Sequence, residues 1–396
     1  MTRVEYIKAQ VLSEIKAKKS ELVNISLTLH ANPELGFKEV KASKLLCAAL
    51  EKNGFEIKRG LSGLDTAFKA SYGQGEPVIA FLAEYDALPH MGHACGHNII
   101  AAASVGAGMA ARRAVDEFGG RVLVIGTPGE ELYGGKTILI KNNAFDGIDV
   151  AMMIHPGMRD VAMVETLACI SLDVEYFGKA AHAAGQPAEG INALEALILA
   201  FSNVNSLRQH IREQSRIHGI ITRGGDAPNI VPEHTAATFL VRDRSMQYLE
   251  ELRERVLDCF VAAALATGTR LEYKWGEITY APLRGNPILA RLFCQSMESL
   301  GRAISMHDPQ AHLGSTDMGN ISQIIPSIHP LVAIASPEIS GHSQQFADAA
   351  RSEAGHHGLL DGATAMALTL VELLAYPEKM AEVKEAFIHN NSHETI

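Results

Sequence analysis

The sequence predicts an α/β protein with a central, mostly parallel sheet, into which a smaller βαββαβ domain is inserted. Three apolar runs, residues 77–83, 121–126 and 149–154, have the composition of buried parallel strands; a helical segment separates the first two, and a glycine-rich loop follows the second. Between residues 169 and 281 apolar and polar residues alternate instead, which is typical of strands with one exposed face. The length of 396 residues also exceeds what one core supports, so two domains are expected.

The first domain comprises residues 1–168 and 282–396. Its amino-terminal part is predicted to contain helices at 4–29 and 40–53, strands at 55–58 and 66–70, the apolar strand at 77–83, and a long small-residue helix from residue 98. The carboxy-terminal part resumes this pattern with helices at 286–300 and 359–376 and a strand at 331–335.

The inserted domain, residues 169–281, is predicted to form a complete small unit of its own. Its expected elements are strands at 170–176, 217–222, 235–242 and 270–275, with helices at 190–209 and 246–267. The resulting order, βαββαβ, is that of a ferredoxin-like sandwich.

The composition narrows the class of protein. A net charge of −10 and the lack of a basic run argue against a nucleic-acid partner. The sequence shows no signal peptide at its start, and we expect no membrane-spanning segment. Five scattered cysteines indicate a reducing cytoplasm, with Cys47, Cys169, Cys259 and Cys294 expected in the cores.

Chemically active side chains follow the ends of the buried strands. They are, in chain order, Glu84, Asp86, Cys95 and His97, then Glu130 and Glu131 in a glycine-rich loop, then His155, with His342 after the strand at 331–335. Because the carboxyl ends of parallel strands meet at one edge of a sheet, these groups are expected to form one binding site. The alternative for the first group alone is a histidine-rich loop with a buried free thiol.

Thiolate, imidazole and carboxylate groups at this density favour a transition metal such as zinc or manganese. Five or six such groups exceed the needs of one tetrahedral zinc, so two ions sharing a bridging ligand and a water are expected. Metal ions lower the pKa of bound water and polarise a carbonyl, and a carboxylate outside the ligand set must then move the proton. Glu130 and Glu131 could divide these tasks, but their spacing does not decide which does which.

Six motifs carry a family resemblance, and they run in the family's order along most of the chain. They are His30-x-x-Pro-Glu-Leu-Gly-x-x-Glu39, Glu84-x-Asp-Ala-Leu-Pro89, Gly92-His-Ala-Cys-Gly-His97, Pro128-Gly-Glu-Glu131, His155-Pro-Gly157 and Gly341-His342. The chain resembles the aminoacylase and glutamate-carboxypeptidase family of dinuclear metallohydrolases. Within it, the chain is similar to the amidohydrolase branch, which includes hippurate, indole-3-acetyl-amino-acid and aminobenzoyl-glutamate hydrolases and Xaa-Arg dipeptidases.

This resemblance implies a phosphorylase/hydrolase-like catalytic domain, with residues 169–281 as a lid through which family members usually form homodimers. It also implies two divalent metal ions, zinc or manganese, with cobalt or nickel as further candidates. The implied bridging ligand is Cys95, with His97 and His155 on one ion and Glu131 and His342 on the other.

The remaining roles concern proton transfer and ligand orientation. The resemblance implies that Glu130 is the general base and acid. Asp86 is expected to fix a ligand histidine from behind, as carboxylates commonly do at metal sites. The other histidines near these motifs are expected to be structural: His90, His93, His312 and His329.

Three residues of the inserted domain match positions that contact the substrate in the family. His182 would stabilise the oxyanion, within its own chain or across a dimer; the alternative is a solvated loop histidine. Asn229 and Arg242 would hold the substrate carboxylate, although Arg242 could equally form an ion pair on the face of a strand.

The expected activity is hydrolysis of a small amide, a dipeptide or an N-acyl amino acid, by attack of metal-bound hydroxide. Many relatives have Asp where this chain has Asn98, which moves the resemblance towards Xaa-Arg dipeptidases and aminobenzoyl-glutamate hydrolases. Two alternatives stay open: hydrolytic deamination or another C–N cleavage at the same site, and a metal-free binding protein that retains the fold.

Overall fold

The computed structural model describes residues 1–308 and 314–392, and the chain divides into two compact units. The larger unit comprises Met1–Glu165, Leu283–His312 and Thr316–Ile396, and the smaller unit comprises Thr166–Pro282 and Leu313–Ser315. Each has its own hydrophobic core, as expected for separate domains.

The larger unit is built on a six-stranded sheet with the order β1-β2-β4-β3-β5-β13. These strands are β1 (Glu56–Arg59), β2 (Phe68–Gln74), β3 (Val78–Ala83), β4 (Gly120–Gly126), β5 (Val150–Met152) and β13 (Ser327–Ile328). The last four in the sheet order run parallel, and β1 and β2 add antiparallel strands. Ala83 lies opposite Gly126, so β3 and β4 end level with each other. The predicted α/β class with a mostly parallel sheet is confirmed.

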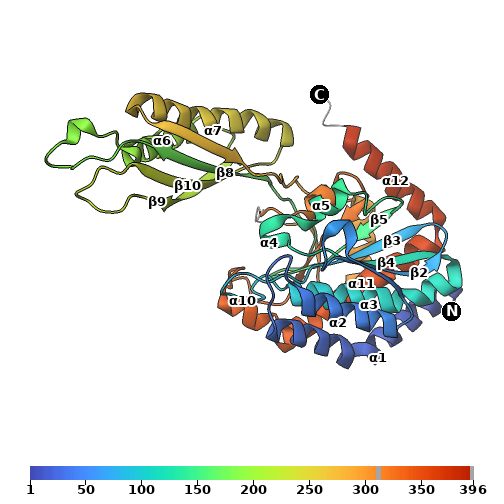
Figure 1. The fold of residues 1–396 in the computed structure, drawn as a ribbon. Helices are drawn as coiled ribbons and strands as arrows, with labels where there is room; N and C mark the ends of the chain where they lie inside the picture. The colour runs from blue at the N-terminus through green and yellow to red at the C-terminus, as the bar shows by residue number, and fades with distance from the viewer. Residues whose placement is uncertain (309–313, 393–396) are drawn as a thin grey trace. The chain divides into compact units, whose positions relative to one another are not determined.

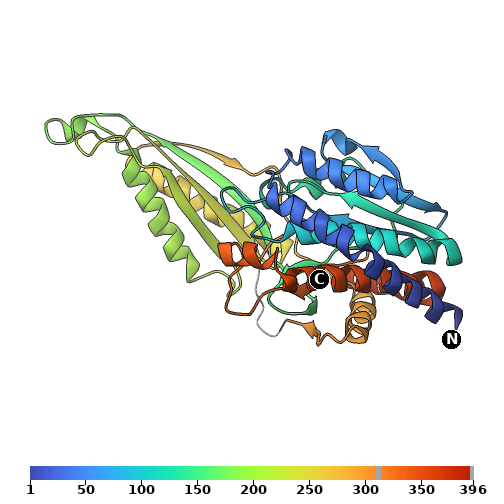
Figure 2. The ribbon, with the colours of Figure 1, turned by 90° about the horizontal axis from the view of Figure 1, so that it is seen from below.

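Helices cover the sheet on both faces (Figure 1). They are α1 (Arg3–Ala31), α2 (Val40–Lys52), α3 (His97–Phe118), α5 (Gly135–Lys141), α8 (Pro287–Ser299), α9 (Met318–Ser322), α11 (Glu353–Ala375) and α12 (Pro377–Ser392). Figure 2 shows α1, in blue, beside α11, in red, although they lie at opposite ends of the chain, and both pack against α3.

Helix α3 approaches its neighbours closely because it consists largely of small residues. A Cβ atom on Gly106 would lie 2.8 Å from Leu22 Cδ1 of α1, and one on Gly108 would lie 2.4 Å from Val124 Cγ2 of the sheet. Neither distance is compatible with a larger side chain unless the backbone moves. The small-residue run at the start of this helix is therefore a packing requirement.

Several short elements of the larger unit were not expected from the sequence. A second sheet has the order β12-β7-β14-β6 and consists of β6 (His155–Gly157), β7 (Val161–Met163), β12 (Ser305–His307) and β14 (Leu331–Ala333). The strand expected at 331–335 is thus β14, and it pairs with β6 and β7 rather than with the main sheet. Three-residue strands are too short to produce a recognisable alternation.

The smaller unit has the predicted order βαββαβ. Its elements are β8 (Ala168–Phe177), α6 (Ala193–Arg208), β9 (Arg216–Arg223), β10 (His234–Asp243), α7 (Met246–Thr267) and β11 (Arg270–Trp275). The sheet order is β11-β8-β10-β9 with antiparallel neighbours, and α6 and α7 cover one face (Figure 1). Tyr176, Phe239 and Phe260 fill the core between the helices and the sheet.

Helix α11 is long and apolar enough to cross a membrane, which the sequence had not led us to expect. However, 78% of its most apolar window is buried inside the structure. Contact with α3, α1 and α8 accounts for this burial, so α11 has the character of a core helix.

Candidate metal centre

The connection from β3 to α3 carries Cys95 and His97. Its conformation depends on Gly96, which has φ +81° and precedes the first residue of α3. A Cβ at this position would lie 2.8 Å from Pro156 Cγ, so only glycine allows the connection to pack against β6. The close packing brings Cys95 Sγ to 3.3 Å from His155 Nε2.

Two groups of ligand-capable atoms share the sulfur of Cys95. One group is Cys95, His97 and His155, and the other is Cys95, Glu131 and His342; within each, the atoms lie within 4.8 Å of one another. Each group offers three protein atoms, the typical number at a catalytic zinc, where a further position stays open. The structure therefore brings together all five residues that the sequence predicts as metal ligands.

The atoms facing this centre fit a cation. His97 Nε2 and Glu131 Oε1 are buried and have no hydrogen-bond partner among the residues that the structure describes. Burial, together with the charge of Glu131, raises the pKa of the Cys95 thiol, so a thiolate here needs a positive charge beside it. Sulfur, imidazole nitrogen and carboxylate oxygen suit zinc or another transition metal.

Asp86 orients two of these residues at once. His97 Nδ1 donates to Asp86 Oδ1 at 2.9 Å and lies 3.0 Å from the backbone oxygen of Asp86, which leaves Nε2 to face the centre. The other carboxylate oxygen accepts the backbone N–H of Glu131 at 3.0 Å. Burial opposes ionisation of Asp86, but His97 and the Glu131 N–H outweigh it and lower its pKa.

Glu130 and Glu131 lie in a one-turn helix, α4 (Glu130–Tyr133), and not in the loop that the glycine pattern suggested. Successive side chains on a helix point in different directions, so the two carboxylates still diverge. The segments on either side of α4 lie close together, because a Cβ on Gly135 would lie 1.8 Å from the backbone oxygen of Pro128. Burial and the nearby acids Glu84 and Asp317 raise the pKa of Glu130 well above its usual range.

A buried ion network that the sequence did not predict lies beside Glu130. Lys136 Nζ donates to Glu84 Oε1 and, at 2.6 Å, to Asp317 Oδ1. The three side chains are at most 1% exposed. The sequence indicated Glu84 because it follows a buried strand, but nothing in the sequence pattern indicated Lys136, a single lysine in a short helix.

The neighbouring histidines pack around the centre without joining these groups. His329 Nδ1 donates to the Met153 backbone oxygen at 3.0 Å, and its ring lies edge-on to that of His155. Burial lowers the pKa of His155, and that of the buried His93, to about 3, so both rings are neutral. His90 is exposed, and His312 lies outside the described residues.

In the smaller unit, His182 and Asn229 lie on two loops joined by backbone hydrogen bonds. The N–H of Ala183 donates to the Asn229 backbone oxygen at 3.0 Å, and His182 forms a bridge with Ile230. His182 Nδ1 accepts the backbone N–H groups of Ala184 and Gly185, at 3.3 and 3.0 Å. Its ring proton is therefore on Nε2, which can donate to a ligand.

Arg242 lies on β10 of the same unit. It donates to Ser315 Oγ at 3.3 Å, and its Nε atom is buried without a hydrogen-bond partner within residues 1–308 and 314–392. An unpaired guanidinium nitrogen can accommodate an additional acceptor such as a carboxylate.

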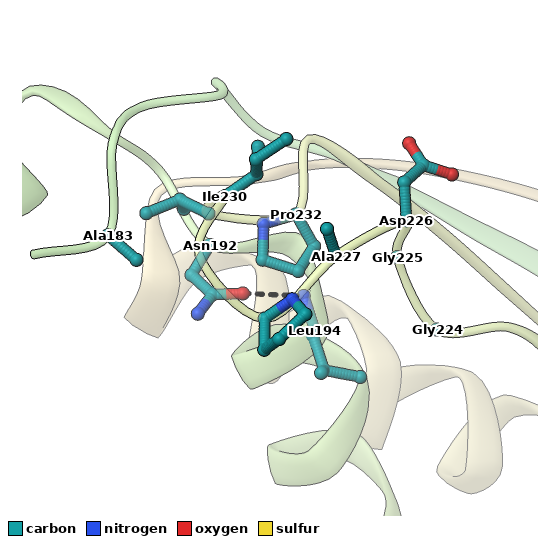
Figure 3. A pocket seen from close by; sticks show the side chains of 11 residues that line it. Ala183, Asn192, Leu194, Gly224, Gly225, Asp226, Ala227, Ile230 and Pro232 are labelled. Carbon is teal, nitrogen blue, oxygen red and sulfur yellow. Dashed lines mark hydrogen bonds between the residues drawn. The ribbon is translucent and has the colours of Figure 1, made fainter.

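A pocket of about 440 Å³ lies between residues 224–232 and the start of α6 (Figure 3). Ala183 and Asn192 line one side, and Asp226 lies on the opposite side. Asn192 Oδ1 accepts the Leu194 N–H at 2.9 Å and so caps the helix. The pocket adjoins the loops that carry His182 and Asn229.

Similarity to known proteins extends over both units. Residues 167–267 match the peptidase dimerisation domain family. The chain is 35% identical to the Xaa-Arg dipeptidase of Mus musculus, over 97% of this chain and 93% of that protein. It is 30% identical to a p-aminobenzoyl-glutamate hydrolase chain of Escherichia coli, over 91% and 90% of the two chains. Its fold matches that of a dinuclear metal-binding M20 peptidase from Bacillus subtilis, with a TM-score of 0.68, 20% identity, and coverage of 91% and 99%.

Proposed function

The chain belongs to the M20 family of peptidases and is a hydrolase of amide bonds, and from this premise we propose that it cleaves a dipeptide or an N-acyl amino acid with two divalent cations. Membership of this family confirms the resemblance found in the six motifs. The observation that carries the proposal is the sulfur of Cys95, which belongs to two groups of three ligand-capable atoms.

In this proposal Cys95 would supply a ligand to both cations, His97 and His155 would hold one of them, and Glu131 and His342 would hold the other. Asp86 supports both sides, because it contacts the His97 ring and the Glu131 backbone. When bound, the cations supply a polarised amide carbonyl and a water of lowered pKa.

Glu130 then acts as the proton carrier. Its carboxylate is beside Glu131 in the chain and lies within 4.0 Å of His97 Nε2, so it borders the centre. It takes the proton of the attacking water and delivers it to the leaving nitrogen. Burial and the surrounding acids raise the pKa of Glu130, so its carboxylate binds the proton that it takes up more tightly than an exposed glutamate would.

The residues of the smaller unit bind the substrate. His182 Nε2 donates to the oxyanion, while Asn229 and Arg242 hold the carboxylate of the released amino acid. The support is that His182 carries its proton on Nε2 and that Arg242 Nε has no partner in the protein.

The first candidate substrate is a dipeptide with a carboxy-terminal arginine. The support is the 35% identity to a protein named Xaa-Arg dipeptidase, together with Asn98 and the residues 315–320 and 328–330, which resemble the same branch. The second candidate is aminobenzoyl-glutamate, because the chain also aligns over 91% of its length with a hydrolase of that name.

These candidates can be separated by a substrate panel. Zinc- or manganese-loaded protein is assayed with Xaa-Arg dipeptides, aminobenzoyl-glutamate and N-acetyl amino acids, and free-amine release is measured. A kcat/KM that is highest for Xaa-Arg dipeptides supports the first candidate. Release of ammonia from a substrate without an amide link would instead favour deamination.

Metal analysis and one substitution test the mechanism. We expect about two transition-metal ions per chain and loss of turnover with a chelator. Glu130→Gln should keep both ions and lower kcat by about 100-fold or more, because a positioned proton carrier is lost. Protein that binds no metal and turns over no amide would support a binding protein, and unchanged turnover in Glu130→Gln would refute the assigned base.

We also propose that the protein is a cytoplasmic homodimer that pairs through its smaller unit. The support is the match to a dimerisation domain, and β9, which lies at the edge of the sheet with Ile220 67% and Ile221 45% exposed. All five cysteines are free thiols, which fits a reducing compartment.

Sedimentation equilibrium tests the pairing. We expect a mass of twice 42.6 kDa, reduced to the monomer mass by Ile220→Lys, which places a charge on the edge strand. A monomer in the unmodified protein at all concentrations would contradict the proposal.

A further inference from the structure

Lys136 is a fully buried cation held at both ends by one aspartate. Its Nζ donates to Asp317 Oδ1 at 2.6 Å, and its backbone N–H donates to Asp317 Oδ2 at 2.9 Å. The same Nζ also donates to Glu84 Oε1. Lys136 is the second residue of α5, Asp317 precedes α9, and Glu84 follows β3, so three elements meet at this ammonium group.

The partners of Lys136 lead directly to the candidate metal centre. Glu84 uses its second oxygen, Oε2, to approach His97 Nε2 at 3.5 Å. Oxygen atoms of Glu84, Glu130 and Asp317 lie within 4.8 Å of one another. Lys136 is thus paired with two of the three carboxylates in this group, and the third is the proposed proton carrier.

Carboxylates this close together, and buried, repel each other strongly unless a cation lies among them. Removing the ammonium group would leave Glu84 and Asp317 uncompensated next to Glu130. Carboxylates left without this cation take up a proton or move towards water, and Glu130, 10% exposed, has more access to water than Glu84 or Asp317.

We propose that Lys136 is a positioning residue for hydrolysis, which holds Glu84 and Asp317 together so that the Glu130 carboxylate stays at the metal centre. This inference rests on the proposed role of Glu130. Among the described residues, the Lys136 ammonium group is paired with Glu84 and Asp317 and also interacts electrostatically with Glu130, so it acts through the carboxylates beside it.

The test is kinetic, with chemical rescue. In Lys136→Ala we expect kcat to fall by about 100-fold, at the lower end of the contribution of a positioned proton carrier, with KM changed less than about threefold. Metal content should remain that of the unmodified protein. Methylammonium, which can fill the space left by the side chain, should restore kcat at least about tenfold with saturation. A larger amine such as tert-butylammonium should not.

Two further variants separate positioning from folding. Arg302 is a matched control, because it also lies between two carboxylates of the larger unit, Asp160 and Asp361, outside the candidate centre. Arg302→Met should lower thermal stability and leave kcat unchanged below its melting temperature. Lys136→Met combined with Asp317→Asn removes one charge of each sign, so it should fold even where Lys136→Ala does not, and it should still be slow.

The outcomes decide between the roles. A folded Lys136→Ala protein, or the double variant, with kcat within threefold of the unmodified protein would overturn the proposal. Loss of metal in proportion to activity would also overturn it, since Lys136 would then support the ligands. The role of Glu130 is tested independently by Glu130→Gln: if that variant remains active, the proposed function fails, whatever Lys136→Ala shows.

Discussion

In the larger unit the candidate side chains are buried and held by other polar groups, whereas in the smaller unit His182 and Asn229 lie exposed on loops. His97 is 1% exposed, and both oxygens of Asp86 are used to fix it and its neighbour Glu131. In the part of the chain that the structure describes, the His182 ring accepts hydrogen bonds from two backbone N–H groups of its own loop. The first arrangement is suited to holding cations at constant distances, and the second is suited to following a substrate.

The largest effect is expected from Cys95. Cys95→Ala leaves each group with two ligand-capable residues, below the three that catalytic zinc typically keeps, so both cations and all turnover should be lost. His155→Ala removes a residue from one group only and should retain about one ion per chain. Mass spectrometry under native conditions measures the metal content of both variants. Equal metal loss in the two would show that the two groups of ligand-capable residues are not joined through Cys95.

A smaller effect on turnover is expected from substitution of His182, which lies on an exposed loop of the smaller unit. His182→Ala should lower kcat by about 100- to 1,000-fold, the usual effect of removing one oxyanion donor, without loss of metal. His210→Ala, in an exposed histidine of the same unit, is the control and should have no effect. If kcat stays within threefold in His182→Ala, His182 is the solvated loop histidine that the sequence left as the alternative.

Because an acidic side chain is buried in the larger unit, the free energy of unfolding should depend on pH. Burial raises the pKa of Glu39 from 4.5 to about 7. The folded state therefore binds this proton more tightly than the unfolded state. The resulting stabilisation of the folded state is complete below about pH 4.5 and is lost as the pH rises through 7. Its size is about 3 kcal/mol, because each unit of pKa difference corresponds to 1.36 kcal/mol.

Glu39→Gln tests this dependence. Relative to the unmodified protein, it should gain stability as the pH is raised from 5 to 8, measured by urea unfolding at fixed metal concentration. Glu51→Gln, at a half-exposed position on α2, should show no such gain. Parallel curves for Glu39→Gln and the unmodified protein would contradict the raised pKa.

The smallest expected effects come from two matched helix caps. Asn192 caps α6 in the smaller unit, and Asn286 caps α8 in the larger unit with the same pair of backbone N–H bonds. Asn286 is 2% exposed and also donates to the Val383 backbone oxygen at 2.9 Å. Asn192→Ala should cost about 1 kcal/mol, and Asn286→Ala about 1–3 kcal/mol more, because a buried oxygen loses its partner. If the two substitutions lowered the free energy of unfolding equally, the burial of Asn286 would add nothing to the effect of its cap.

The sequence was most informative where one pattern continues over many residues. The bounds predicted for α7 and β11 match the structure, because a long periodic helix followed by an alternating strand leaves little ambiguity. The grouping of Cys95, His97, Glu131 and His155 could be expected because each follows a buried strand whose end lies at the same sheet edge. His342 was grouped with them for the same reason, and it does lie with Cys95 and Glu131, although the strand before it, β14, belongs to another sheet.

The sequence was least informative where a contact depends on tertiary packing. Lys136 and Asp317 are 181 residues apart and lie in short helices, so neither periodicity nor spacing indicates their contact. Helix α12 was not predicted, although Pro377 begins it as proline often begins a helix. Asn98 was noted only as a departure from relatives, but its amide donates to Ser26 and to the Ala350 backbone oxygen, at 2.9 and 3.0 Å.

Helix α3 begins at His97 and meets α1 and the sheet through glycines that leave no free space. A change in the angle of this helix would drive backbone into Leu22 or Val124, so the imidazole at its first residue cannot be re-aimed by gradual substitution. Descendants of this chain can therefore acquire new substrates by altering exposed loops, while the reacting atoms keep one geometry. The close packing of α3 thus leaves the exposed loops free to change in sequence, while the position of His97 is conserved or the site is lost.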